Sequence, residues 1–151
     1  MPEIRLSAER SIDAPAEVVY SCIADYREFH RPGGFLPPAY SDFEIERGGV
    51  GAGTVIRFKI TVGGQTRAYL QEVSEPEPGR VLVEAGSVAT TTFTVLPEGQ
   101  RSRVRFETVW NASGVQGFFE RLLAPRMLRP LYLDELDRLE RLARTLNGAK
   151  P

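Results

Sequence analysis

The sequence predicts an α+β protein in which one antiparallel sheet packs against a long C-terminal helix. Three observations lead to this fold class: an apolar period of two over residues 41–111, helical spacing over residues 114–147, and one strand and one short helix before them. With 151 residues the chain has the size of a single domain, which we expect to span residues 1–151. A chain of about 150 residues can form a core without disulfides, since it buries roughly 70% of its unfolded surface.

The N-terminal part reads as a strand followed by a helix. Residues 3–12 alternate apolar and polar side chains from Ile4 to Ile12, which is typical of a half-buried strand. Pro15 suits the first turn of a helix, because the N–H that proline lacks would be unpaired there. Apolar residues then recur at steps of three and four, so we expect the helix to continue to about Phe29.

The middle of the chain reads as a series of short strands. Phe43 and Ile45 alternate with acidic residues, and Ile56, Phe58 and Ile60 alternate with basic or polar ones. Further strand-like runs cover residues 66–75, 80–86, 88–97 and 101–111. The turns between the runs are rich in glycine or proline and too short for parallel crossovers, so the strands are expected to be antiparallel.

Residues 114–147 return to helical spacing. A leucine stripe marks the buried face and consists of Leu136, Leu139, Leu142 and Leu146. Pro125 and Pro130 interrupt the first half of this segment, which predicts a kink or a break there.

Composition excludes several classes of protein. The net charge is −1, from 19 basic and 20 acidic side chains, so a general nucleic-acid binder is disfavoured. One cysteine excludes an internal disulfide framework and a cysteine-rich zinc site. No stretch approaches the roughly 18 apolar residues of a membrane span, and no apolar segment of a secretory signal follows the charged N-terminus. We therefore expect a cytoplasmic protein without stable membrane insertion.

Several short segments resemble the SRPBCC superfamily (START-like, or helix-grip), and within it the polyketide cyclase/dehydrase and lipid transport type. These segments are SIDAPAEVVY at 11–20, AD at 24–25, GAGT at 51–54 and EVSEPEP at 72–78. The resemblance covers essentially the whole chain. It implies a helix-grip fold, in which a curved antiparallel sheet of about seven strands wraps round the C-terminal helix, with a small helical segment after the first strand.

The resemblance also implies a cavity between the sheet and the helix. A curved sheet cannot follow a straight helix along its whole length, so side chains or a ligand must fill the gap. Apolar residues of inward parity are the candidates for the cavity wall, although a packed core would use the same residue types. The candidates are Phe58, Ile60, Tyr69, Phe93, Phe106, Trp110, Phe118 and Leu122.

Polar residues that interrupt an apolar face are candidates for polar ligand contacts, because burying them unpaired costs roughly 2–7 kcal/mol. They are Arg10, Glu72, Thr91 and Thr108. The parity of residues 66–75 is ambiguous, so Glu72 is either a buried carboxylate paired with Arg10 or a solvated side chain. His30, the single histidine, follows the first helix and is either a contact at the cavity mouth or an exposed loop residue.

No motif of established catalytic or metal-binding spacing is present in the sequence. One histidine and one cysteine leave only carboxylates for a metal, and no EF-hand or HExxH pattern occurs. Cys22 falls on the apolar face of the first helix, as expected of an inert core thiol. We therefore assign no catalytic set, and we predict no metal and no cofactor.

Three functions are consistent with the sequence. The first is the binding or carriage of a hydrophobic small molecule, such as a lipid, a quinone or an aromatic polyketide-like compound, by a protein that is not an enzyme. The second is a polyketide cyclase/dehydratase-like (aromatase/cyclase-like) enzyme that uses acid and base residues of the cavity. The third is a protein-interaction module built on the apolar residues around 118–133. We expect a monomer or a homodimer in each case.

Overall fold

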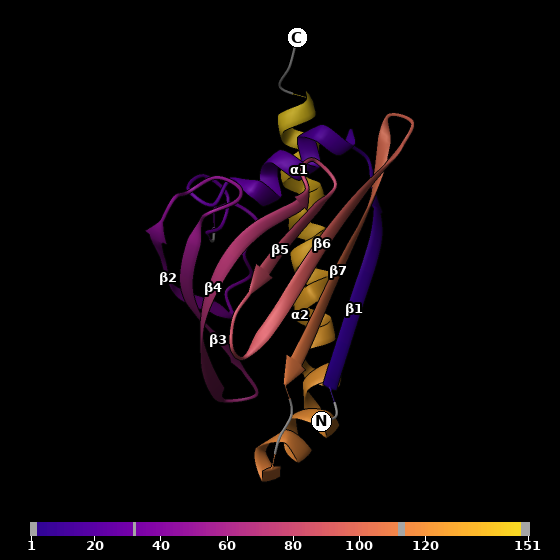
Figure 1. Ribbon diagram of the computed structural model, residues 1–151. Coiled ribbons are helices and arrows are strands. Elements are labelled where there is room, and N and C mark those ends of the chain that lie inside the picture. The colour runs from indigo at the N-terminus through magenta and orange to yellow at the C-terminus, as the bar shows by residue number, and fades with distance from the viewer. Residues whose placement is uncertain (1–2, 32, 112–113, 149–151) are drawn as a thin grey trace.

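The computed structural model describes the backbone of residues 3–31, 33–111 and 114–148, and the side chains of these residues except 3 and 111–127 (Figure 1). The strands are β1 (Glu3–Ile12), β2 (Tyr40–Arg47), β3 (Val55–Val62), β4 (Gln65–Glu77), β5 (Val81–Ala85), β6 (Ala89–Glu98) and β7 (Arg101–Asn111). The helices are α1 (Ala16–Ala24) and α2 (Gly114–Gly148). The predicted α+β class and the predicted order of elements are confirmed.

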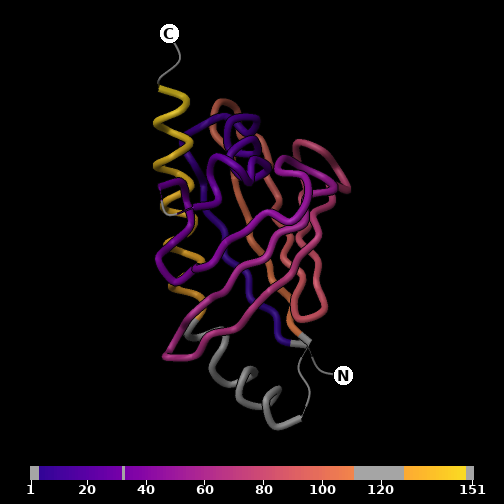
Figure 2. The backbone as a smooth tube through the Cα atoms, turned by 90° about the vertical axis from the view of Figure 1, so that its left-hand side faces the viewer, coloured from indigo at the N-terminus to yellow at the C-terminus, as the bar shows by residue number. Residues whose placement is uncertain are grey.

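All strands belong to one antiparallel sheet with the order β1-β7-β6-β5-β4-β3-β2. The first strand therefore pairs with the last strand of the chain, and Ile4 lies opposite Trp110 in their register. Register shifts between β2 and β3 and between β4 and β5 bend the sheet, because a bulge adds twist to the strand that carries it. Asp42 lies in the β2 irregularity with a φ of 50°, in the left-handed region. The resulting curved sheet lies along one side of α2 (Figure 2).

Helix α1 is shorter than the sequence predicts. It ends at Ala24 and not near Phe29, because a glycine-rich loop from residues 48–53 docks against its C-terminus. The Tyr26 N–H donates to the Gly49 carbonyl at 2.9 Å, and the Gly51 N–H donates to the Ala24 carbonyl at 2.9 Å. These long-range hydrogen bonds satisfy backbone groups that would otherwise continue the helix.

Helix α2 is one element from Gly114 to Gly148, so of the predicted kink or break at Pro125 and Pro130 the break does not occur. An interior proline removes one backbone hydrogen bond, and a helix held by tertiary packing can lose that bond without ending. Its main contacts are with β1, with further contacts to α1 and β7. Leu136 and Leu139 of the predicted leucine stripe are fully buried.

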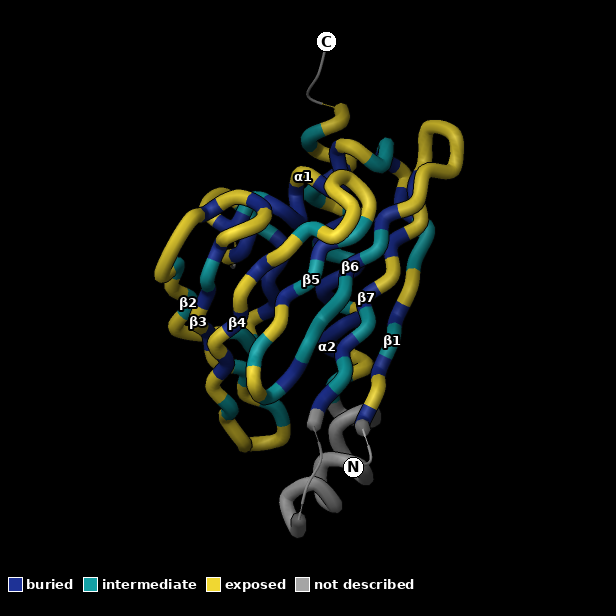
Figure 3. The backbone as a smooth tube through the Cα atoms, viewed as in Figure 1, coloured by how far each residue is buried: buried dark blue, intermediate teal, exposed yellow. Residues whose placement is uncertain are grey.

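Buried and exposed positions alternate along the strands, so the core lies between the inner face of the sheet and the helices (Figure 3). In β4 the inward side chains are Tyr69, Gln71 and Val73, which resolves the ambiguity of this strand. None of the described helices is long and apolar enough to cross a membrane.

Candidate functional site

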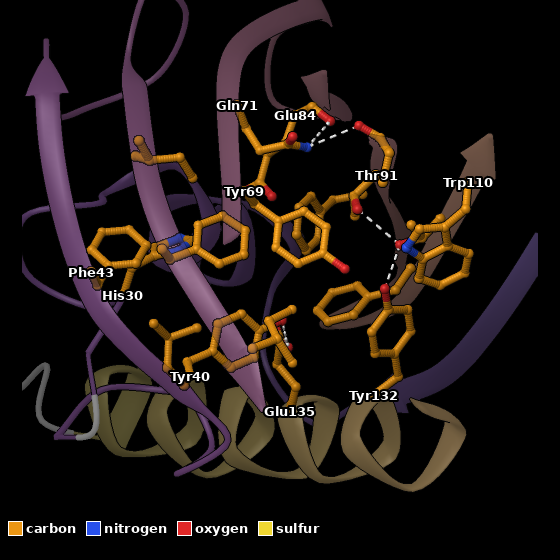
Figure 4. Close-up of a pocket in the computed structure, with 18 residues that line it drawn as sticks. His30, Tyr40, Phe43, Tyr69, Gln71, Glu84, Thr91, Trp110, Tyr132 and Glu135 are labelled. Carbon is orange, nitrogen blue, oxygen red and sulfur yellow. Dashed lines mark hydrogen bonds between the residues drawn. The ribbon is translucent and has the colours of Figure 1, made fainter. Parts of the chain in front are cut away.

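A cavity lies between the inner face of the sheet and helix α2, and side chains from β2 to β7, from α2 and from the segment after α1 line it (Figure 4). Its interior offers about 30 Å³ to the centres of water-sized molecules. One buried water needs roughly 10–15 Å³ by this measure, so the cavity is narrow. A ligand the size of an aromatic ring would have to move side chains of the wall apart.

Six of the predicted cavity residues lie in this wall, and most of them are aromatic: Phe58, Ile60, Tyr69, Phe93, Phe106 and Trp110. Phe118 and Leu122 lie outside the described side chains. The Phe58 and Tyr69 rings stack with centroids 5.2 Å apart, and Phe93 meets Phe106 edge to face at 4.4 Å. Such pairs are the favoured geometries of aromatic rings.

Two of the predicted polar residues form a hydrogen-bonded chain across the cavity. The Thr91 and Thr108 hydroxyls lie 2.8 Å apart, and Thr108 Oγ1 lies 2.6 Å from the Tyr132 hydroxyl (Figure 4). The chain joins β6 and β7 to α2, so the polar atoms on this side of the wall already satisfy one another. Burial raises the pKa of the Tyr132 hydroxyl, so it stays protonated.

His30 lines the cavity and is buried, so it is not an exposed loop residue. Its Nε2 lies 2.7 Å from the Ile23 carbonyl, which can only accept, so Nε2 carries the proton. The imidazole stacks on Tyr26 at 3.9 Å and meets Phe35 edge to face at 4.6 Å. Burial lowers the pKa of His30 to about 3, against the raising effect of the Ile23 hydrogen bond. The ring is therefore neutral near pH 7 and is a weak base.

Arg10 and Glu72 do not line the cavity, so their assignment as cavity contacts is wrong. Arg10 lies on edge strand β1, and its long side chain reaches α2, where it pairs with Asp137 at 3.3 Å and Glu140 at 2.8 Å. Glu72 is exposed, because its neighbours of the opposite parity point inward. A pair between Arg10 and Glu72 is likewise not formed.

Sequence reasoning missed two acidic residues of the cavity. Glu84 on β5 is 6% exposed, and its Oε2 accepts a hydrogen bond of 2.5 Å from the Tyr26 hydroxyl. Burial raises the pKa of Glu84 to about 7, although the Tyr26 hydrogen bond acts in the opposite direction. Glu84 shares the parity of the fully buried Leu82, but Val81 and Val83 on the opposite face are apolar as well, so the sequence of this strand does not mark either face as inward.

The second missed residue is Glu135 on α2, which is 3% exposed. Its Oε1 accepts a hydrogen bond of 2.9 Å from the Tyr40 hydroxyl. Burial raises the pKa of Glu135 to about 8; the Tyr40 hydrogen bond lowers it, while the charges of Glu84 and Asp134 raise it further. Its signal was helical spacing, since Glu135 lies four residues before Leu139 and three after Tyr132, which are both buried.

Gln71 adds an unpaired buried acceptor to the same wall. Its Nε2 donates to the carbonyls of Glu84 and Ala89, at 3.0 and 3.1 Å, whereas its Oε1 is buried without a hydrogen-bond partner. The part of the chain whose side chains are described contains no cluster of three or more residues that could hold a metal ion. Cys22 is buried, and burial raises the pKa of its thiol to about 12.

The comparison with protein families decides the identity of the fold. Residues 3–144 match the family described as polyketide cyclase / dehydrase and lipid transport. The chain belongs to this family. A search of curated protein sequences gave no match.

Solved structures of similar architecture agree with this membership in the polyketide cyclase/dehydrase and lipid transport family. KanY protein is 31% identical over 95% of this chain and 99% of its own, with a TM-score of 0.80. The Zhui aromatase/cyclase from a Streptomyces species is 16% identical over 99% of both chains, with a TM-score of 0.74. Norcoclaurine synthase from Thalictrum flavum, in complex with a transition-state analogue, is 16% identical over 96% of both chains, with a TM-score of 0.71. The last two similarities concern the fold alone.

Within this family fold, the cavity combines three chemical features. Many of its lining side chains are aromatic, two carboxyl groups are buried in it, and Gln71 Oε1 has no hydrogen-bond partner among the described residues. Of the expected interaction surface around 118–133, residues 118–127 lie outside the described side chains, and Leu131 and Tyr132 in the remaining part are buried. The cavity is therefore the candidate functional site.

Proposed function

We propose that the protein binds a hydrophobic small molecule with an aromatic ring in the cavity between its sheet and α2. The observation that carries this proposal is the aromatic wall, in which Phe43, Phe58 and Tyr69 form a run of stacked rings on neighbouring strands. Stacked side chains of this kind complement a planar ring better than a long acyl chain. Quinones and aromatic polyketide-like compounds therefore fit better than lipids. Membership in the family supports a hydrophobic small molecule as the ligand.

Polar atoms of the wall would orient such a ligand. The Tyr69 hydroxyl and the Trp110 indole N–H have no hydrogen-bond partner within the described part of the chain, and both residues line the cavity. A carbonyl or hydroxyl oxygen on the ligand could accept from either group. A few well-placed polar groups in a largely apolar wall are typical of small-molecule sites.

Trp110 gives a direct test, because it is the single tryptophan and lies in the wall. We expect 4-phenylbutanol to shift the indole N–H cross peak of Trp110 saturably in ¹H–¹⁵N spectra. Phe58→Ala should weaken this binding about tenfold, as part of the transfer free energy of the phenyl group is lost. Leu70→Ala is the matched control, since Leu70 on neighbouring β4 is 54% exposed.

Two results would reject binding in this cavity. One is a Trp110 cross peak that does not move up to the solubility limit of the alcohol. The other is a shift whose midpoint is the same in Phe58→Ala and in the wild type, provided that the variant keeps the dispersed spectrum of a folded protein.

Acid–base catalysis is a second candidate function, favoured by Glu84 and Glu135. Burial brings the pKa values of both carboxyl groups to about 7 and 8, so both protonation states are accessible near neutrality. In the dehydration of a β-hydroxyketone, one carboxylate would take the α proton while the other carboxyl group protonates the departing hydroxyl. The C–H and C–O bonds break, a C=C bond forms, and water leaves.

The dehydration of 4-hydroxy-4-phenylbutan-2-one tests this candidate, because its enone product absorbs in the near ultraviolet. We expect turnover above the buffer rate in the wild type, with roughly a hundredfold loss in Glu84→Gln and Glu135→Gln. The exposed Glu72→Gln should behave like the wild type. A wild-type rate equal to buffer would reject dehydration and leave the binding proposal intact.

A further inference from the structure

Among the described residues that line the cavity, the charged groups are all acidic. They are Glu84 and Glu135, and no lysine or arginine belongs to this described lining. His30, a third titratable group of this wall, is neutral because burial lowers its pKa, although its hydrogen bond to the Ile23 carbonyl acts in the opposite direction. Among the described ion pairs none includes Glu84 or Glu135, so each buried carboxyl group lacks a cationic partner.

Each of these carboxyl groups also keeps an oxygen free. Tyr26 occupies Oε2 of Glu84 and Tyr40 occupies Oε1 of Glu135, so the other oxygen of each group has no hydrogen-bond partner within the described residues. Gln71 supplies an independent observation of the same kind. It is 2% exposed, lines the same cavity, and its Oε1 is an acceptor without a donor.

A cation would complement this arrangement on three counts. Its positive charge compensates the burial of a carboxylate, which is costly when the carboxylate is unpaired. Its N–H groups can donate to carboxyl and amide oxygens that lack donors, and hydrogen bonds between charged groups are the stronger ones. The faces of the surrounding aromatic rings attract a cation as well. A carboxylate or phosphate on the ligand would instead meet two acidic groups and no lysine or arginine among the described lining residues.

We propose that the ligand is an aromatic or otherwise hydrophobic molecule that carries a protonated amine, and that Glu84 and Glu135 receive its ammonium group. This inference rests on the proposed binding function and adds the charge of the ligand. It excludes fatty acids and other anionic lipids as ligands of this cavity.

Three probes that differ only in the end group test the charge preference: 4-phenylbutylamine, 4-phenylbutanol and 4-phenylbutyrate. At pH 8 and low salt, the amine should bind at least about tenfold more tightly than the alcohol, measured by calorimetry and by the Trp110 cross peak. The carboxylate should bind more weakly than the alcohol. Glu84→Gln or Glu135→Gln should remove most of the advantage of the amine over the alcohol.

Glu72→Gln is the matched control, because it removes the same charge from the outer side of β4 and should leave all three affinities unchanged. The charge inference is overturned if the alcohol binds as tightly as the amine. It is also overturned if the advantage of the amine survives in both cavity variants. The proposed binding function fails separately, when none of the three probes moves the Trp110 cross peak.

Discussion

The two faces of the sheet hold acidic side chains in opposite electrical surroundings. On the outer face, Glu9 and Glu98 both pair with Arg103, at 3.2 and 3.1 Å, and Glu107 pairs with Arg105 at 3.0 Å. On the inner side, the carboxyl groups of Glu84 and Glu135 face phenols and aromatic rings. The outer arginines alternate along β7, as expected of a solvated strand face, and they are exposed.

The difference shows where acidic residues cost free energy. An exposed ion pair contributes little to stability, because water already solvates both partners. A buried carboxylate without a cation is costly, and it lowers that cost by holding its proton. Acidic residues on the outer face are therefore ordinary, because water solvates them. Acidic residues on the inner face cost free energy, and a role in ligand binding would account for their presence.

The pH dependence of stability should give the largest effect of this contrast. Glu84 and Glu135 have pKa values of about 7 and 8 in the folded protein, above the ordinary value of 4.5, so the folded state holds protons that the unfolded state has released. The free energy of unfolding therefore falls as pH rises through these values. From pH 6.5 to 8.5 we expect a loss on the order of 2 kcal/mol, measured by urea unfolding.

His30 sets the lower limit of this pH window. Its pKa is lowered to about 3, so it remains neutral in the folded protein and opposes stability only as pH falls below about 6.5. Glu84→Gln and Glu135→Gln should each flatten the decline above pH 6.5, because glutamine keeps the hydrogen bond of the tyrosine and carries no charge. A wild-type stability that is equal at both pH values would contradict the buried acids, as would an equal flattening in Glu72→Gln.

The sequence predicts the elements that depend on local residues and misses those that depend on long-range contacts. Strand β7 was predicted to the residue, because the alternation along residues 101–111 depends on local residues alone. The end of α1 could not be predicted, since it depends on hydrogen bonds that join the Tyr26 N–H and the Ala24 carbonyl to a loop that begins at residue 48. Local patterns do not contain such long-range contacts.

The two cavity acids escaped prediction for related reasons. Glu84 lies in the five-residue strand β5, where Val81 and Val83 are apolar as well, so no alternation marks one face as inward. Glu135 borders a leucine stripe, and its direction depends on the rotation of α2 against a curved sheet. The aromatic wall could be predicted, because an aromatic side chain on the apolar face of a strand points inward. This holds whether the side chain belongs to a packed core or lines a cavity.

The smallest effect should come from the outer face. Arg103 carries two ion pairs in full solvent, so Arg103→Gln should lower the melting temperature at low salt by no more than about 2 °C. In about 1 M salt, where screening acts within roughly 3 Å, the difference from the wild type should disappear. The pH dependence contributed by Glu84 and Glu135 should persist in that salt, because ions do not enter the protein interior. If salt instead removed the pH dependence and left the Arg103→Gln difference unchanged, the contrast between the two faces would be wrong.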